Sequence, residues 1–169
     1  MRVGKVLWVL FKTTVFTALV PGTVGFWVPY RIRQGTRAPD VLIASASEVG
    51  LSYFLLIAGA AIYLWCAWDF SVKGMGTPAP IDAPKNLVIN GLYRFVRNPM
   101  YLGVSCMILS QALVGWSLEI LFYLALVVIA FNLFVRLYEE PHLRKIFGEQ
   151  YLEYCRRVPR WTPRFRPVQ

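Results

Sequence analysis

The chain has 169 residues, the length of one domain, and 57% of them are apolar, with a mean hydropathy of +0.49. This apolar fraction and this mean hydropathy are higher than those of soluble globular proteins, which indicates a membrane protein. The charged residues lie between and after the apolar runs. The net charge of +9 therefore favours an anionic membrane surface over nucleic acid as a partner.

Four apolar stretches are each close to the roughly 20 residues that a bilayer-spanning helix needs. The expected spans cover residues 5–30, 49–70, 99–116 and 118–138. We expect a kink in the first span at Pro21-Gly22, and a close helix approach in the second at the small residues Ala58–Ala61. No small-residue cleavage site closes the basic and apolar start, so we expect the first span to be a retained anchor rather than a signal peptide.

The last two spans are separated only by Gly115, Trp116 and Ser117, which predicts a tight antiparallel helical hairpin. Most lysines and arginines fall on the side that holds both termini and the loop 71–98, and this bias predicts a cytoplasmic location for all three. We therefore expect an all-α polytopic membrane protein, a single domain over residues 1–169. The short loops favour a prokaryotic inner membrane.

The loop 71–98 and the tail 139–169 lie on the predicted cytoplasmic side of the membrane. Prolines in the loop favour an extended path, and "NLVINGLY" predicts a short strand with a turn at Asn90-Gly91. A loop this long usually carries function. The tail predicts an amphipathic helix followed by a basic and aromatic stretch suited to the membrane interface, with one face formed by Leu143, Phe147, Tyr151 and Tyr154.

Polar side chains gather at the cytoplasmic end of the expected hairpin. One group lies at the start of the third span: Tyr93, Arg94, Arg97, Asn98 and Tyr101. There Pro99 occupies the favoured first helical position and Asn98 is a suitable N-cap. At the end of the fourth span, Arg136 and Glu140 have the spacing of an ion pair along one helix face, with Glu139 beside them. A helix N-terminus suits a carboxylate and a glutamate suits an ammonium group, so the cluster predicts a zwitterionic ligand.

Two segments in this order resemble a known family. The stretch "NLVINGLYRFVRNPMYLG", followed after one helical pair by "RLYEEPHLRKIFGEQYLEYCRRVPRW", resembles the integral membrane methyltransferases related to isoprenylcysteine carboxyl methyltransferase and phospholipid N-methyltransferase. The resemblance covers residues 74–163. It implies an S-adenosylmethionine-dependent enzyme without a Rossmann domain, whose cofactor is enclosed by the hairpin, the preceding loop and the folded-back C-terminal segment.

The resemblance also implies individual site residues. The loop that lines the cofactor pocket in this family corresponds to Lys85, Asn86, Leu87 and Val88. The family's Gly-x-Tyr-Arg, His-Pro-x-Tyr-x-Gly and Glu-Glu motifs place cofactor contacts at Tyr93, Asn98, Pro99, Met100, Tyr101, Gly103, Glu139 and Glu140. The substrate-contacting arginine of the isoprenylcysteine enzymes has its nearest equivalent at Arg136. Asn98 replaces the frequent histidine and cannot titrate near neutral pH, so no proton transfer is expected there.

We therefore expect methyl transfer from S-adenosylmethionine to a lipophilic acceptor, with a lipid amine, an isoprenylcysteine-like carboxylate and a small thiol all open. The sulfonium methyl is already activated, so alignment of the acceptor is the main requirement. Neither a metal site nor a disulfide framework is predicted from three distant cysteines and one histidine.

Three other classes stay open as alternatives. A non-catalytic binding or assembly protein on the same scaffold would not need both polar motifs. A small transporter should carry buried charges near mid-membrane; only Lys12 and Asn132 qualify, and Lys12 lies near enough to the interface to extend to it. A nicotinamide-dependent lipid reductase would need a phosphate-binding surface, and Gly74–Ala79, which formally matches a dinucleotide fingerprint, is followed by prolines instead of a helix.

Overall fold

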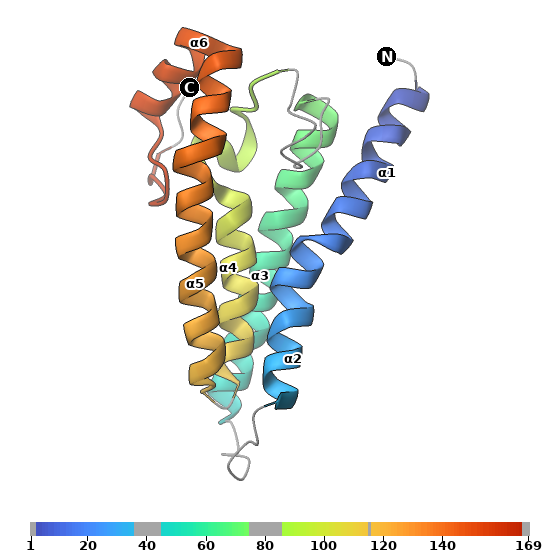
Figure 1. The fold of residues 1–169 in the computed structure, drawn as a ribbon, viewed down its shortest axis with the longest axis vertical. Helices are drawn as coiled ribbons and strands as arrows, with labels where there is room; N and C mark the ends of the chain where they lie inside the picture. Colours follow the sequence, from blue (N-terminus) through green and yellow to red (C-terminus); the bar gives the residue numbers. More distant parts are fainter. Residues whose placement is uncertain (1–2, 36–44, 75–85, 115, 167–169) are drawn as a thin grey trace.

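The computed structural model describes residues 3–35, 45–74, 86–114 and 116–166, and these are mainly helical with no strand among them. The regular helices are α1 (Val3–Leu19), α2 (Val28–Gly35), α3 (Ala46–Asp69), α4 (Pro99–Leu113), α5 (Leu118–Phe134) and α6 (Glu140–Arg157). Three π-helical turns, η1 (Thr23–Trp27), η2 (Phe70–Gly74) and η4 (Val135–Glu139), and the 3-10 helix η3 (Gly91–Arg94) join them. In Figure 1, α3, α4 and α5 run side by side and α1 leans away from them.

Three continuous helices are long and apolar enough to cross a membrane: Leu7–Gly35, Ala46–Gly74 and Leu118–Arg157. They contain the first, second and fourth expected spans. The third expected span, 99–116, forms α4, which ends at Leu113 after 15 residues. Large apolar side chains such as Trp8, Phe54 and Phe122 are about two-thirds exposed on the outer helix faces, where lipid would cover them (60%, 66% and 67%).

The first expected span changes direction where the sequence predicted it. The regular helix α1 ends at Leu19, beside Pro21, and the chain continues through η1 into α2 at a different angle (Figure 1). Carbonyl groups of η1 bond to side chains of the core helices. Gln111 Nε2 donates to the Gly25 carbonyl at 2.5 Å, and Tyr123 Oη donates to the Val24 carbonyl at 3.0 Å.

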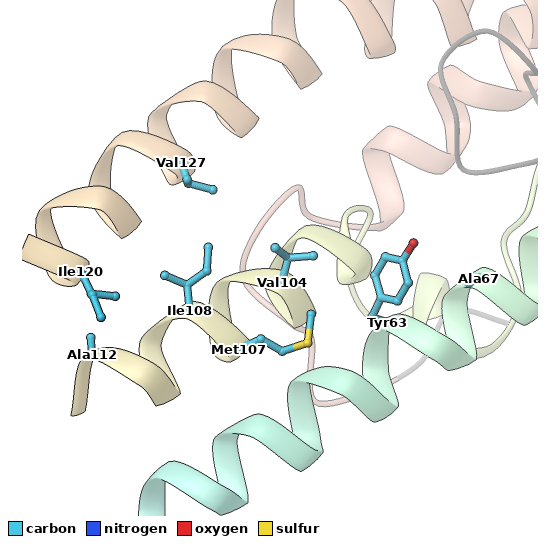
Figure 2. Packing of buried hydrophobic residues seen from close by; sticks show 8 residues of the cluster. All are labelled: Tyr63, Ala67, Val104, Met107, Ile108, Ala112, Ile120 and Val127. Carbon is cyan, nitrogen blue, oxygen red and sulfur yellow. The ribbon is translucent and has the colours of Figure 1, made fainter. Parts of the chain in front are cut away.

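The core lies between α3, α4 and α5, and Figure 2 shows its buried side chains: Tyr63, Ala67, Val104, Met107, Ile108, Ala112, Ile120 and Val127. The closest approach of α3 and α4 is at Gly59, inside the predicted small-residue cluster. A Cβ atom at Gly59 would lie 2.6 Å from the Gly103 carbonyl oxygen, and one at Gly103 would lie 2.7 Å from the Gly59 carbonyl oxygen. The predicted close approach is confirmed.

We expect Gly59→Ala to lower the free energy of unfolding by about 1–3 kcal/mol, because the added methyl forces two backbones apart. Gly50, on the same helix, is the matched control, since a Cβ there meets nothing within 4 Å. Gly50→Ala should be neutral or stabilise by up to about 1 kcal/mol. Thermal unfolding in one detergent compares the two variants. Equal shifts of the unfolding temperature in both variants would contradict the close crossing of α3 and α4 at Gly59.

The predicted strand in "NLVINGLY" is wrong, although its turn is present. Gly91 has φ 58°, and the Tyr93 amide donates to the Asn90 carbonyl at 3.1 Å as η3 begins. No neighbouring strand is present among the described residues, so Val88 packs instead against Cys66 and Tyr93. Gly91 lies so close to α3 that a Cβ would stand 2.5 Å from Asp69 Oδ2.

The expected amphipathic tail helix is α6, and its predicted apolar face is turned inward. Tyr151 is buried, and the other three residues of that face are half-buried. The helix is interrupted at Gly148, whose φ of 53° and ψ of −128° strongly favour glycine. In Figure 1, α6 folds over the ends of the other helices, and the segment after it runs back along α5.

Candidate functional site

A cavity of about 40 Å³ lies where the ends of α3, α5 and α6 meet the segment before α4. Two π-helical turns border it, η2 through Phe70 and η4 through Val135 and Glu139. Such turns are frequent at functional sites. The lining residues are Phe70, Leu87, Val88, Tyr93, Arg97, Asn98, Val135, Glu139, Glu140, Leu143, Tyr151 and Tyr154.

Six of the residues predicted from the sequence line this cavity: Leu87, Val88, Tyr93, Asn98, Glu139 and Glu140. Four others belong to α4 and are not among the lining residues: Pro99, Met100, Tyr101 and Gly103. Asn86 is exposed, and its Nδ2 donates to the Lys73 carbonyl at 3.5 Å. Lys85 lies outside the described residues, as does most of the loop before it.

The predicted pairing of Arg136 with Glu140 is wrong. Arg136 is exposed on η4 and does not line the cavity, whereas the Glu140 side chain is only 5% exposed. The π-helical turn between them changes the register, so a four-residue spacing no longer places both side chains on one face. Glu140 has other arginines as partners.

Glu140 is the centre of an ion-pair network. Arg97 Nη1 lies 2.9 Å from its Oε1, and Arg160 donates to both oxygens, from Nε at 2.7 Å and from Nη2 at 2.8 Å. Burial acts to raise the pKa of Glu140, but the hydrogen bonds and charges of Arg160 and Arg97 outweigh it and lower the pKa below its usual range. Glu140 therefore remains ionised and ties the C-terminal segment to the start of α4.

Glu139, which follows the last expected span, has a different environment. Tyr101 Oη donates to its Oε2 at 2.8 Å, and no salt bridge to Glu139 occurs among the described residues. Burial raises the pKa of Glu139, and the hydrogen bond from Tyr101 opposes this only in part. Within the described ranges this carboxylate has no cationic partner, an environment that suits a ligand ammonium group.

Arg97 supplies the complementary donor. Its Nη1 is used by Glu140 and by Cys155 Sγ, which accepts at 2.8 Å, but its buried Nε has no hydrogen-bond partner in the described part of the chain. A buried donor without an acceptor is costly, and a water molecule or a ligand oxygen in the cavity would satisfy it. The motif comparison did not assign Arg97 to cofactor binding, although its position in the polar cluster was a signal.

Asn98 occupies the N-cap position of α4 with Pro99 first in the helix, as predicted, but its side chain does not cap the helix. Its Nδ2 instead donates to the Arg160 carbonyl at 3.1 Å, and the neighbouring Arg97 amide donates to the Pro159 carbonyl at 3.0 Å. The C-terminal segment therefore lies against the start of α4, and its carbonyl groups accept both hydrogen bonds.

Several residues that line the cavity were not predicted as site residues, because they come from distant segments of the chain. They are Phe70, Val135, Leu143, Tyr151 and Tyr154. For the last two, the amphipathic face of α6 was the available signal. Tyr154 Oη also donates to the Tyr93 carbonyl at 2.8 Å, which joins α6 to η3. In the described ranges, no group of three or more His, Cys, Asp or Glu side chains could hold a metal ion.

Comparison with known proteins gives a consistent result. Residues 47–150 match the family model described as phospholipid methyltransferase. The chain is 36% identical over 114 residues to a phosphatidylethanolamine N-methyltransferase of Pyrenophora tritici-repentis, which covers 62% of this chain and 13% of that protein. It is 34% identical over 79 residues to protein-S-isoprenylcysteine O-methyltransferase B of Arabidopsis thaliana, covering 46% of this chain and 39% of that protein. The chain therefore spans less than half the length of either relative. No solved structure matches it.

Proposed function

The chain belongs to the phospholipid methyltransferase family, and from this premise we propose that it is an integral membrane enzyme transferring a methyl group from S-adenosylmethionine to a lipophilic acceptor. The observation that carries the proposal is the pairing, in one cavity, of Glu139, which has no cationic partner among the described residues, with Arg97, whose Nε has no acceptor among them. A zwitterionic amino-acid group needs both. The lipid amine is the first acceptor to test, because the family description and the relative with the longer match both name phospholipid chemistry.

The residues present fit the amino-acid end of the cofactor. Glu139 would accept from the ammonium group and Arg97 Nε would donate to the carboxylate, while Tyr93 and Tyr151, which also line the cavity, are aromatic residues suited to a cation. S-adenosylmethionine supplies a methyl group already activated on its sulfonium. The protein's task is to align the acceptor and exclude water. Leu87 and Val88 would cover the loop side.

Cofactor binding requires the cavity to widen. Its volume of about 40 Å³ has room for only a few water molecules, each of which needs about 10–15 Å³ of such space. The break at Gly148 separates the first half of α6 from the part that carries Tyr151 and Tyr154. We infer that this second half pivots outward at Gly148 to admit the cofactor, while the segment after it keeps its contacts with α4 and α5.

The membrane arrangement is part of the same proposal. We place α4 as the third of four spans, paired with α5 in a hairpin, with the site and both termini on the cytoplasmic side. Fifteen helical residues extend about 22 Å, less than the roughly 30 Å hydrocarbon core. The residues flanking α4 would cross the remaining depth. This is tolerable because α4 is largely surrounded by protein, with Met107, Ile108 and Ala112 buried.

The raised pKa of Glu139 predicts a pH dependence of cofactor binding. The ionised carboxylate binds the ammonium group, so affinity should be full above the pKa of Glu139 and fall as the pH drops through it. Because burial raises this pKa, the fall should begin at a higher pH than for an ordinary glutamate. Calorimetric titrations at several pH values measure it. In Glu139→Gln this acid-side fall should be absent, and an unchanged profile would contradict the assignment.

Binding of S-adenosylmethionine to the detergent-purified protein tests the proposed cofactor. We expect saturable binding by calorimetry and none with NADPH, which a reductase would require. Saturable NADPH binding without S-adenosylmethionine binding would overturn the proposal in favour of the reductase class.

A further inference from the structure

Asn132 is the single amide in the apolar run of α5, and the cavity does not involve it. Its Oδ1 accepts a hydrogen bond at 3.1 Å from the indole Nε1 of Trp161, which follows α6 in the C-terminal segment. The amide is thus used by a residue 29 positions further along the chain. A polar group in an apolar helix is costly unless it is satisfied, and Trp161 satisfies it.

The same indole lies against a residue that touches the site. The Trp161 and Tyr101 rings have centroids 6.3 Å apart in an edge-on arrangement, and the Phe131 ring lies 4.7 Å from Tyr101. Tyr101 is therefore enclosed between α5 and the C-terminal segment. Its hydroxyl points to Glu139, to which it donates at 2.8 Å.

We propose that Trp161, held by Asn132, is a positioning residue for the cofactor site: it fixes the Tyr101 ring so that the Tyr101–Glu139 hydrogen bond is formed before the cofactor binds. The inference rests on the proposed function, because the group it positions is the one assigned to the ammonium. Neither Trp161 nor Asn132 lines the cavity, so each acts through Tyr101. A carboxylate that is already held in one orientation binds its ligand more tightly, because less conformational entropy is lost on binding.

The neighbouring residue gives the inference independent support. Arg160 bonds to both oxygens of Glu140, and its carbonyl accepts from Asn98 Nδ2. Two consecutive residues of the C-terminal segment thus hold the two consecutive glutamates, Arg160 directly and Trp161 through Tyr101. The segment that closes over the site also sets the geometry of its acidic groups.

The test compares S-adenosylmethionine dissociation constants of six proteins by calorimetry: the wild type, four single variants and one double variant. Asn132→Leu removes the acceptor, and Trp161→Phe keeps a ring but removes the donor. Each should weaken binding about fivefold, the effect of one hydrogen bond. In a Tyr101→Phe background, which lacks the positioned hydroxyl, Asn132→Leu should have no further effect. Phe165→Ala, which removes a fully exposed aromatic side chain from the same segment, should bind as the wild type does.

An equal loss from Asn132→Leu in both backgrounds would overturn the inference, because the effect would then not pass through Tyr101. If no protein binds S-adenosylmethionine, the proposed function fails, and the indole N–H resonance of Trp161 in the unliganded protein decides the inference separately. We expect that resonance to shift in both Asn132→Leu and Tyr101→Phe. If neither substitution shifts this resonance, the contacts of Trp161 with Asn132 and Tyr101 are contradicted.

Discussion

Replacing Glu139 by glutamine is expected to weaken S-adenosylmethionine binding by about 10- to 100-fold. The substitution keeps the side-chain shape and the acceptor for Tyr101 but removes the charge that faces the ligand ammonium. A hydrogen bond to a charged group contributes about 1.5–3 kcal/mol, which corresponds to this range. Calorimetry on the purified variant at neutral pH measures the change.

Glu149→Gln is the matched control, since Glu149 also follows α5 but its side chain is 75% exposed. It should bind the cofactor as the wild type does. If both variants lose the same affinity, a general effect of negative charge explains the result and Glu139 is not the binding carboxylate.

Replacing Glu140 by alanine is expected to lower the free energy of unfolding by about 3 kcal/mol, because it leaves Arg97 and Arg160 without their counter-ion. The Arg97 side chain is only 12% exposed, so solvent cannot replace the lost partner. Since the pKa of Glu140 is lowered, its stabilisation is present above the usual glutamate range and is lost as the pH falls through the folded-state value. Denaturant unfolding in detergent measures both effects.

Glu153→Ala serves as the comparison. Glu153 also pairs with two arginines, Arg156 and Arg157, but all three side chains are at least 42% exposed. Exposed pairs contribute at most about 1 kcal/mol. A loss from Glu153→Ala as large as that from Glu140→Ala would show that burial of the network does not matter.

The helices were predictable because their causes are local. Long apolar runs mark the spans, Pro99 marks the first residue of α4, and the spacing of apolar residues marks the buried face of α6. The close crossing at Gly59 also follows from the small residues beside it. In each case the signal lies within one element, where hydropathy and backbone chemistry decide the structure.

The errors arise where a distant segment decides the local structure. The stretch before η3 has the residues of a strand but packs on α3, and the Asn98 side chain bonds to the C-terminal segment instead of capping α4. Arg136 and Glu140 have the spacing of an α-helical pair, but the turn between them is π-helical. For the same reason, the roles of Arg97 and Trp161 emerge only when the C-terminal segment is seen against α4 and α5.

Methyl transfer itself is the most direct test of the account. The protein in phosphatidylethanolamine vesicles is incubated with methyl-labelled S-adenosylmethionine, with isoprenylcysteine and small-thiol acceptors in parallel and Glu139→Gln as the inactive control. We expect label in a lipophilic acceptor, first in the lipid amine, and little label with the variant. A folded protein that labels none of the three acceptor classes would contradict it.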